Sequence, residues 1–432
     1  MKMVVISTSL LIGCCIYFAT LMYNSSLAID FYQYWGVGAA QKLSGGVLSN
    51  PYVNVKQYDS FLDKYSTTSG DERLRLSNIR NHMLYRQSLD VNATPLLYAL
   101  FALFPAKFSL SYGIFLALMV VVLLPVSYLF CHYPRPSAIP VLLGILFVFY
   151  HEPLRADAQV GNLNTLQFFS MAVLTYFIAV LIDEQAERQT FFRDAAVLSG
   201  IVLLILLKPN FLIIGLALSA SVFVKRSARA FSKAAAAAAS VGILLFLIPC
   251  IYFNSWSVWN DWFGYLSLGS GKISRYNVQE GNFATSVIVS NLWDFSVNST
   301  MVLICAVLMI SLMLCLGTER IVKKVGMILH NPYLAVVMAV SATLALSPLV
   351  WFHYYVISLL PAIWMTMQPL STPSRYLGGF SLFLSSGLIV RMLDVNEYLP
   401  FVFASSWVPL WIGALVLISS MKPAADDVKI VG

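Results

Sequence analysis

Apolar stretches of membrane-spanning length follow one another along most of the chain. A helix of about 20 apolar residues crosses the hydrocarbon core of a bilayer. Such stretches, several of them short, lie at residues 3–23, 110–132, 138–151, 162–182, 194–207, 209–224, 234–253, 299–316, 332–347, 349–368, 376–393 and 404–420. The pattern predicts an all-α polytopic membrane protein, a single integral membrane domain over residues 1–432 with about twelve transmembrane helices.

Two long segments, residues 24–109 and 254–298, interrupt the apolar pattern. Near the start of the first segment, the residues that follow Asp30 repeat aromatic and small side chains at helical spacing. Such spacing is typical of a helix that lies at the membrane surface with an aromatic face. The first long segment is therefore expected to contain interfacial helices.

Two further stretches of this segment are expected to be helical. Residues 94–105 are apolar but too few to cross a bilayer, so we interpret them as a re-entrant or interfacial helix that ends at Pro105. Residues 71–89 have the spacing of an amphipathic helix and carry four arginines, Arg73, Arg75, Arg80 and Arg86. Such a helix either lies against lipid head groups or recruits an anionic lipid substrate.

The composition excludes an ordinary soluble enzyme. Hydrophobic residues make up 59% of the chain and charged residues 11%, against roughly 45–50% and 25% in soluble domains. The six cysteines lie in or beside apolar stretches, without the spacing of a disulfide framework or a zinc site. The sequence therefore indicates no cofactor and no metal ligands, and it leaves a requirement for a divalent metal open.

The distribution of basic residues predicts the orientation of the chain in the membrane. With the N-terminus in the cytoplasm, fourteen of the 27 Lys and Arg residues fall in cytoplasmic segments, and five fall on the opposite face when the long first segment 24–109 is left out. This bias follows the positive-inside rule, which discounts long loops. Segments 24–109 and 254–298 then both face outward. Because the cytoplasmic segments account for the whole net charge of +7, the charge does not indicate a nucleic-acid partner.

Polar residues occur at the ends of several apolar stretches, and this orientation brings them to one face. They lie after the first stretch (Asp30), in the second outward turn (151–164), between two apolar runs (Lys208) and in the segment 347–353. A charge near membrane depth costs roughly 2.5–3.5 kcal/mol, so Lys208 needs a partner or a function. We therefore predict one site at the outer membrane surface, with cations for an anion and with Asp30 and His353 for proton transfer.

Asp30 and Lys208 also have simpler interpretations. Asp30 begins a predicted helix, and aspartate is favoured at the N-cap, where it accepts hydrogen bonds from backbone N–H groups. Lys208 lies at a helix end, from which a lysine can extend its ammonium group to the interface. Asp30 is thus either an N-cap or a general base, and the two roles are compatible.

Several short motifs occur in an order that resembles a known family. They are Asp30-Phe31-x-x-Tyr34-Trp35, Gly45-Gly46, Thr94-Pro95-Leu96-Leu97, Arg155, Gly161-Asn162-x-Asn164, Lys208-Pro209 and Ser347-Pro348-x-x-Trp351-x-His353. In this order, from about residue 10 to 365, the chain resembles glycosyltransferase family 87. These integral-membrane enzymes of the GT-C fold are typified by polyprenyl-phosphate-mannose-dependent α-mannosyltransferases of bacterial envelopes. The family more often has glutamine at the position of Asn162.

The resemblance implies a multi-pass protein of the bacterial inner membrane with an extracytoplasmic active site. The donor would be a polyprenyl-phosphate sugar, commonly mannose, and the acceptor a hydroxyl of a lipid or glycan, in contact with membrane lipids. The catalytic aspartate of the family matches Asp30, and His353 would contact the acceptor, orient Asp30 or meet the phosphate. The expected substrate-binding residues are Tyr34, Trp35, Arg155, Asn162, Asn164, Lys208 and Trp351. With one carboxylate base, the displacement would invert the anomeric centre.

Two other classes of membrane protein fit parts of the pattern. An O-antigen ligase or polymerase also has about twelve spans and a basic outward loop, but there the largest loop tends to lie late in the chain. A lipid or solute transporter or flippase has a suitable number of spans, but the two halves of this chain are not alike and charges within span centres are nearly absent. The glycosyltransferase remains the first hypothesis.

Overall fold

The computed structural model describes residues 28–68, 70–84, 89, 91–131, 151–180, 187–273, 282–293, 295–317, 321–368, 373–386, 388 and 399–421. This part of the chain is almost entirely helical, and its only β pairing is an isolated bridge between Asn282 and Trp351. The expected spans 3–23 and 138–151 lie outside the described residues, except for His151.

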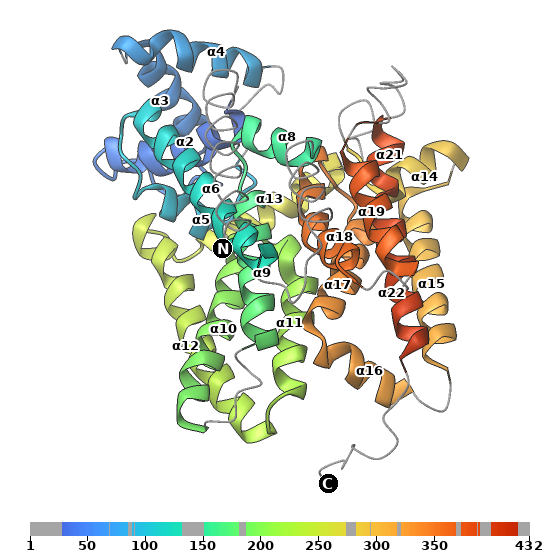
Figure 1. The fold of residues 1–432 in the computed structure, drawn as a ribbon. Helices are drawn as coiled ribbons and strands as arrows, with labels where there is room; N and C mark the ends of the chain where they lie inside the picture. Colours follow the sequence, from blue (N-terminus) through green and yellow to red (C-terminus); the bar gives the residue numbers. More distant parts are fainter. Residues whose placement is uncertain are drawn as a thin grey trace.

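The N-terminal part consists of helices that belong to the first long segment and its continuation (Figure 1). Their bounds are α2 (Ile29–Leu43), α3 (Val55–Thr68), the 3-10 helix η1 (Gly70–Glu72), α4 (Arg73–Leu84), α5 (Pro95–Phe101) and α6 (Phe108–Cys131). The central helices are α8 (Glu152–Val160), α9 (Asn164–Val180), α10 (Glu187–Leu207), the 3-10 helix η2 (Pro209–Phe211), α11 (Leu212–Val224), α12 (Ala228–Tyr252) and α13 (Val258–Ile273).

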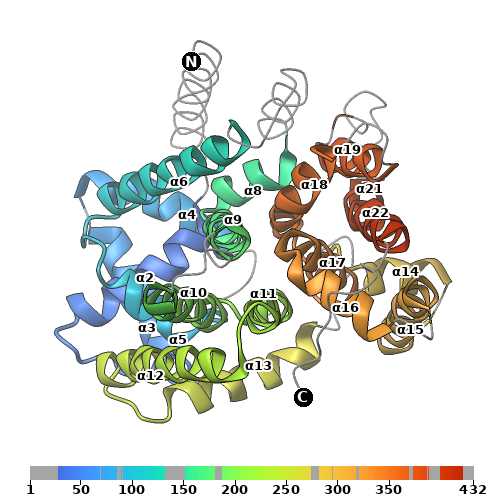
Figure 2. The same cartoon turned by 60° about the horizontal axis from the view of Figure 1, so that its bottom comes forward.

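The C-terminal part forms a second group of helices (Figure 2). Its elements are α14 (Thr285–Trp293), α15 (Val297–Leu316), α16 (Ile321–His330), α17 (Pro332–Leu346), the 3-10 helix η4 (Phe352–Ser358), α18 (Leu359–Thr366), α19 (Pro373–Ser385), α21 (Leu399–Ser405) and α22 (Trp407–Ser420). The chain has two apolar cores among the described residues. One joins the first-segment helices to α13 and the end of α12, and the other joins α9–α12 to the C-terminal helices.

Within the described residues, three helices are long and apolar enough to cross a membrane: Ala228–Tyr252, Val297–Leu316 and Phe401–Ser420. A fourth candidate is the pair α16 and α17, which is bent by 101° at the break between them. Other expected spans appear as shorter helices, such as α9 and α11. The all-helical fold and the apolar helices agree with a membrane protein, while the expected number of twelve spans stays a prediction.

The helix predicted after Asp30 is present as α2, but it does not lie on a surface. Every residue from Phe31 to Gln41 is buried. Helix α5 packs so closely against α2 that a Cβ on Gly38 would lie 2.8 Å from the carbonyl oxygen of Tyr98. The aromatic residues of α2 thus form the centre of an apolar core, because α3–α6 and α8 pack against the helix.

Within the described residues, the predicted helix 71–89 consists of η1 and α4, and residues 85–88 lie outside them. Two of its arginines make contacts within the protein. Arg80 forms ion pairs with Asp59 and Asp63 at 3.3 and 3.2 Å, and the guanidinium of Arg75 lies 5.2 Å from the centre of the Tyr112 ring. These two side chains hold α4 to its neighbours, while Arg86 lies outside the described residues.

The two long segments contact each other. The side-chain amide of Asn50 donates to Asp261 at 2.6 Å, and the Trp262 indole donates to the carbonyl of Asn92 at 3.2 Å. The first segment also meets the end of α10, where the Thr94 hydroxyl donates to the carbonyl of Leu207 at 3.1 Å. Segments far apart in sequence therefore surround one end of the central helices (Figure 1).

Candidate active site

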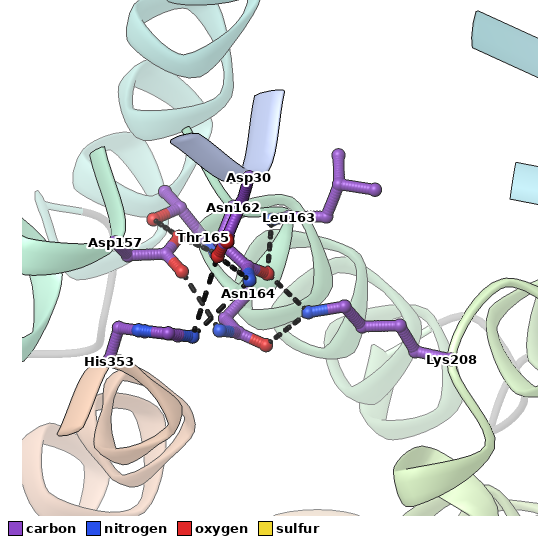
Figure 3. Close-up of polar contacts among 8 residues, drawn as sticks. All are labelled: Asp30, Asp157, Asn162, Leu163, Asn164, Thr165, Lys208 and His353. Carbon is purple, nitrogen blue, oxygen red and sulfur yellow. Dashed lines mark hydrogen bonds and ion pairs between the residues drawn. The ribbon is translucent and has the colours of Figure 1, made fainter. Parts of the chain in front are cut away.

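Polar side chains from four parts of the chain meet where the first segment covers the central helices (Figure 3). Asp30 comes from the first turn of α2, and Asn162 and Asn164 come from the junction of α8 and α9. Lys208 lies between α10 and η2, and His353 lies in η4. The structure thus brings together five residues that the sequence singles out over a span of more than 300 positions.

Asn162 lies at the centre of this network. Its Nδ2 donates to Oδ2 of Asp30 at 2.7 Å, and its Oδ1 accepts hydrogen bonds from the Leu163 backbone N–H, at 2.7 Å, and from the Lys208 ammonium group. Since an ammonium and an N–H can only donate, the orientation of this amide is fixed by its partners. One asparagine therefore connects a carboxylate to a cation.

The same amide indicates the protonation state of His353. Nδ2 of Asn162 lies 3.2 Å from Nε2 of the imidazole, which in turn lies 4.0 Å from Oδ2 of Asp30. Because the amide nitrogen must donate, Nε2 accepts and carries no proton in this arrangement. His353 is then neutral, with its proton on Nδ1 and an unprotonated nitrogen beside the Asp30 carboxylate.

Lys208 is held by amide oxygens rather than by carboxylates. Its Nζ donates to Oδ1 of Asn162 and to Oδ1 of Asn164, the latter at 2.7 Å, and lies 5.4 Å from the centre of the Tyr354 ring. Burial lowers the pKa of its ammonium group to about 8, and the negative charges of Asp157 and Asp30 oppose this shift. The ammonium therefore still carries its charge at neutral pH and keeps capacity for an anionic ligand.

Asp157 belongs to the network, although the sequence did not single it out. Its carboxylate is fully buried and accepts from Asn164 Nδ2 at 2.8 Å and from the Thr165 backbone N–H and hydroxyl at 2.8 and 2.7 Å. The sequence offered one signal for Asp157: it is an acidic residue between two apolar stretches, five positions before Asn162.

Gly161 determines how the chain passes from α8 to α9. It ends α8 with φ 72°, a left-handed conformation that glycine adopts at little cost. A Cβ at this position would lie 2.5 Å from Cβ of Phe31, so α8 and α2 could not approach as closely with any other residue. This close approach brings Asn162 to Asp30.

His353 is positioned by a segment that the sequence did not connect with it. Asn282 is fully buried; its Oδ1 accepts from the backbone N–H groups of Val350 and Ala284, each at 3.1 Å, and its Nδ2 donates to the Pro348 carbonyl. Asn282 also forms the isolated bridge with Trp351. The end of the second long segment therefore fixes the backbone that leads into η4.

Asp30 is not the N-cap of its helix. That position belongs to Ala28, which has φ 45° and makes no side-chain capping bond, while Asp30 lies inside the first turn. The backbone N–H of Ala28 donates to the Gln159 carbonyl at 3.0 Å, which ties the start of α2 to the end of α8. The Asp30 carboxylate is thus turned toward Asn162.

The other expected substrate-binding residues lie in different surroundings. Tyr34 is buried near the network; burial raises the pKa of its phenol well above the ordinary value, and the charge of Asp30 adds to the shift. Trp35 is fully buried in the first-segment core, and its indole donates to the Pro105 carbonyl at 3.0 Å. Arg155 is exposed, and its guanidinium lies 3.7 Å from the Glu152 carboxylate.

Chemically, the network combines two carboxylates, a neutral imidazole and an ammonium group within a few hydrogen bonds of one another. A carboxylate can accept a proton from an alcohol, and an ammonium can stabilise an anionic leaving group. Among the described residues, no three His, Cys, Asp or Glu side chains gather closely enough to hold a metal ion.

The comparison with known families was made on the sequence. The model of glycosyltransferase family 87 matches residues 94–348, which is more than half of the chain. The match includes Asp157, Asn162, Asn164 and Lys208, while Asp30 and His353 lie on either side of it. No curated protein and no solved structure matches the chain. The match to the family model shows that the chain belongs to glycosyltransferase family 87 and is a membrane glycosyltransferase.

Proposed function

We propose that the protein transfers a hexose, with mannose as the first candidate, from a polyprenyl-phosphate carrier to a hydroxyl of a cell-envelope glycolipid or glycan. The proposed reaction takes place at the extracytoplasmic surface of a bacterial inner membrane. Family membership supports the transfer of a sugar. The polyprenyl-phosphate donor is supported by the chemistry of the network, which offers a cation for a phosphate beside a base for an alcohol.

The acceptor hydroxyl is activated by Asp30. An alcohol is a poor nucleophile at neutral pH, so its proton passes to the Asp30 carboxylate as its oxygen attacks the anomeric carbon. Neutral His353, 4.0 Å from Asp30, is the second group that can hold this proton or orient the hydroxyl. A single displacement of this kind inverts the anomeric centre, so a β-linked donor gives an α-linked product.

The leaving group is stabilised by Lys208. As the bond between the anomeric carbon and the phosphate oxygen breaks, the electron pair stays on the lipid phosphate and its negative charge increases. A fixed ammonium group that contacts this phosphate stabilises the transition state more than the ground state. The exposed cation of Arg155 and the aromatic side chains of Tyr34 and Trp351 are proposed to bind the phosphate and the sugar around this centre.

The observation that carries the proposal is the chain of bonds from Asp30 through Asn162 to Lys208. The amide keeps the carboxylate and the ammonium apart, at 2.7 Å from Asp30 on one side and in hydrogen-bond contact with Lys208 on the other. Two opposite charges that are separated in this way remain available to an incoming alcohol and a departing phosphate.

A donor panel tests the proposed reaction. Membranes that contain the wild-type protein or Asp30→Asn are supplied with labelled polyprenyl-phosphate mannose, the corresponding glucose and arabinose donors, and nucleotide sugars. We expect transfer from one of the polyprenyl-phosphate donors, none directly from the nucleotide sugars, and a loss of about 10³-fold in Asp30→Asn. Transfer from a nucleotide sugar alone would exclude the proposed donor.

We also propose a GT-C-type arrangement in which segments 24–109 and 254–298 face outward from a single membrane domain of about twelve spans. The contacts between the two segments support a common side. Cysteine labelling tests it in a background without the six native cysteines. Ser60→Cys, at an exposed position of α3, should react with an impermeant reagent added outside, and Ala228→Cys, at the exposed start of α12, should react only after permeabilisation. The reverse pattern would contradict the proposed sidedness.

A further inference from the structure

The proposed transfer steps give no role to the carboxylate of Asp157. It is fully buried on α8 and makes its hydrogen bonds to the first two residues of α9, Asn164 and Thr165. A carboxylate in this place satisfies N–H groups at the helix start and is stabilised by the helix dipole. A structural role in capping α9 would account for the bonds to Thr165 but not for the bond to Asn164.

The bond to Asn164 links Asp157 to Lys208. The amide of Asn164 donates through Nδ2 to Asp157 at 2.8 Å and accepts through Oδ1 from Lys208 at 2.7 Å. If the amide turned over, its NH₂ group would face the ammonium, which cannot accept a hydrogen bond. The carboxylate therefore keeps Asn164 in the orientation that presents an oxygen to Lys208.

The network is symmetrical about Lys208. Asp30 is joined to it through Asn162, and Asp157 is joined to it through Asn164, so two carboxylates flank one ammonium without touching it. The other titratable groups near this centre are Tyr34 on α2 and His353 and Tyr354 on η4. With His353 neutral, Asp30 and Asp157 are the charges that act on Lys208.

We infer that Asp157 is a positioning residue of the proposed transfer reaction: through Asn164 it aims Lys208 and keeps it an ammonium ion for the leaving phosphate. This inference rests on the proposed function. Burial lowers the pKa of Lys208 to about 8, and the charge of Asp157 is the largest influence that opposes this shift. Burial raises the pKa of Asp157 to about 6, and Lys208 opposes that shift in turn. Both groups are thus charged at neutral pH.

Competitive labelling of Lys208 tests the inference without a transfer assay. Trace acetic anhydride reacts only with unprotonated amines, so the extent of labelling at Lys208, read by mass spectrometry across a pH series, gives the midpoint of its titration. We expect Asp157→Asn to lower this midpoint by about one unit, the size of effect expected from loss of one nearby opposite charge. Thr165→Val removes one hydrogen bond from the Asp157 carboxylate but keeps the charge of that carboxylate. The Lys208 midpoint in Thr165→Val should therefore equal that of the wild type.

Transfer measured over the same pH range gives the second readout. As the pH rises, the rate of transfer by Asp157→Asn should begin to fall about one pH unit below the point at which the wild-type rate falls. The loss of rate relative to the wild type should be smallest at the acidic end of the range. If Asp157→Asn instead leaves the Lys208 midpoint unchanged and lowers transfer equally at every pH, Asp157 is only the cap of α9 and the inference is wrong.

Asn164→Ala keeps the inference testable where Asp157→Asn fails to fold. This variant removes the link to Lys208 and leaves the bonds between Asp157 and Thr165 in place. It should remain folded but lose at least tenfold in transfer, and unchanged transfer would overturn the inference. A wild-type protein that transfers no sugar from any donor, while Asp157→Asn still shifts the Lys208 titration, would overturn the proposed function and not the coupling.

Discussion

The two ends of the α10–α11 hairpin hold charged residues in opposite ways. At one end Arg226 pairs directly with Asp194, through Nε at 2.7 Å and Nη2 at 3.2 Å, and the two side chains are 13% and 2% exposed. At the other end Lys208 has two carboxylates nearby, but an asparagine amide stands between it and each of them.

The difference separates a structural pair from charges that we propose to act on a substrate. A bidentate pair such as Asp194 with Arg226 satisfies both charges locally and leaves neither of them for a ligand. An ammonium bonded to amide oxygens keeps its charge, and the carboxylates beyond the amides keep theirs. Buried charges that are close but not in contact are thus the ones expected to act on a substrate.

The largest effect on transfer is expected at the end of the hairpin that holds Lys208. Lys208→Met removes the cation and should lower transfer by about 10³-fold at saturating donor, because the charge that develops on the leaving phosphate loses its partner. The exposed Lys233 on α12 offers a matched control, since Lys233→Met should retain the wild-type rate. A Lys208→Met protein that keeps more than a tenth of the rate would remove Lys208 from the proposed mechanism.

At the structural end the expected loss is in stability. Asp194→Asn leaves the Arg226 guanidinium without its carboxylate and should lower the free energy of unfolding by about 3 kcal/mol. Thermal unfolding in detergent measures this loss. The rate of transfer per folded molecule should stay near that of the wild type, and a selective loss of rate would show that the two ends do not differ as described.

The titration of Lys208 adds a pH dependence of known sign. Since burial lowers its pKa to about 8, transfer should fall as the pH rises through about 8 and the ammonium is lost. The stability contribution of the same group changes in the opposite direction. The unfolded chain binds this proton more tightly, so stability from Lys208 increases between about pH 8 and its ordinary pKa. A rate that falls while the unfolding temperature also falls would point to unfolding instead.

The smallest effect is expected for Trp35. Its indole donates to the Pro105 carbonyl inside the first-segment core, away from the network. Trp35→Phe should lower the free energy of unfolding by about 1 kcal/mol, the value of one buried hydrogen bond. The KM for the donor decides whether Trp35 binds substrate: an unchanged KM would remove it from the predicted substrate-binding residues, and a clear rise would support that prediction.

Much of the site could be predicted from sequence because membrane insertion makes polar residues costly. Asn162, Asn164, Lys208 and His353 lie at the ends of apolar stretches, and the distribution of basic residues puts them on the same face as Asp30. The structure brings these five side chains together. Their catalytic and binding roles remain predictions.

Other features depend on tertiary contacts that no local pattern encodes. The helix after Asp30 was expected at a surface, but α3–α6 bury it, and its N-cap is Ala28 rather than Asp30. The role of Asp157 could not be read from the spacing of polar residues, because its hydrogen-bond partners belong to the next helix. Asn282 fixes residues nearly 70 positions away in the chain through their backbone groups, which sequence spacing cannot reveal.

The most direct test of the account compares Asp30→Asn with Asp194→Asn in one experiment. Both variants replace a carboxylate by an amide of the same shape, one in the proposed site and one in the structural pair. At equal amounts of folded protein, Asp30→Asn should lose about 10³-fold in transfer and keep its unfolding temperature, whereas Asp194→Asn should keep its rate and lose stability. Transfer by Asp30→Asn at a rate near that of the wild type would contradict the account.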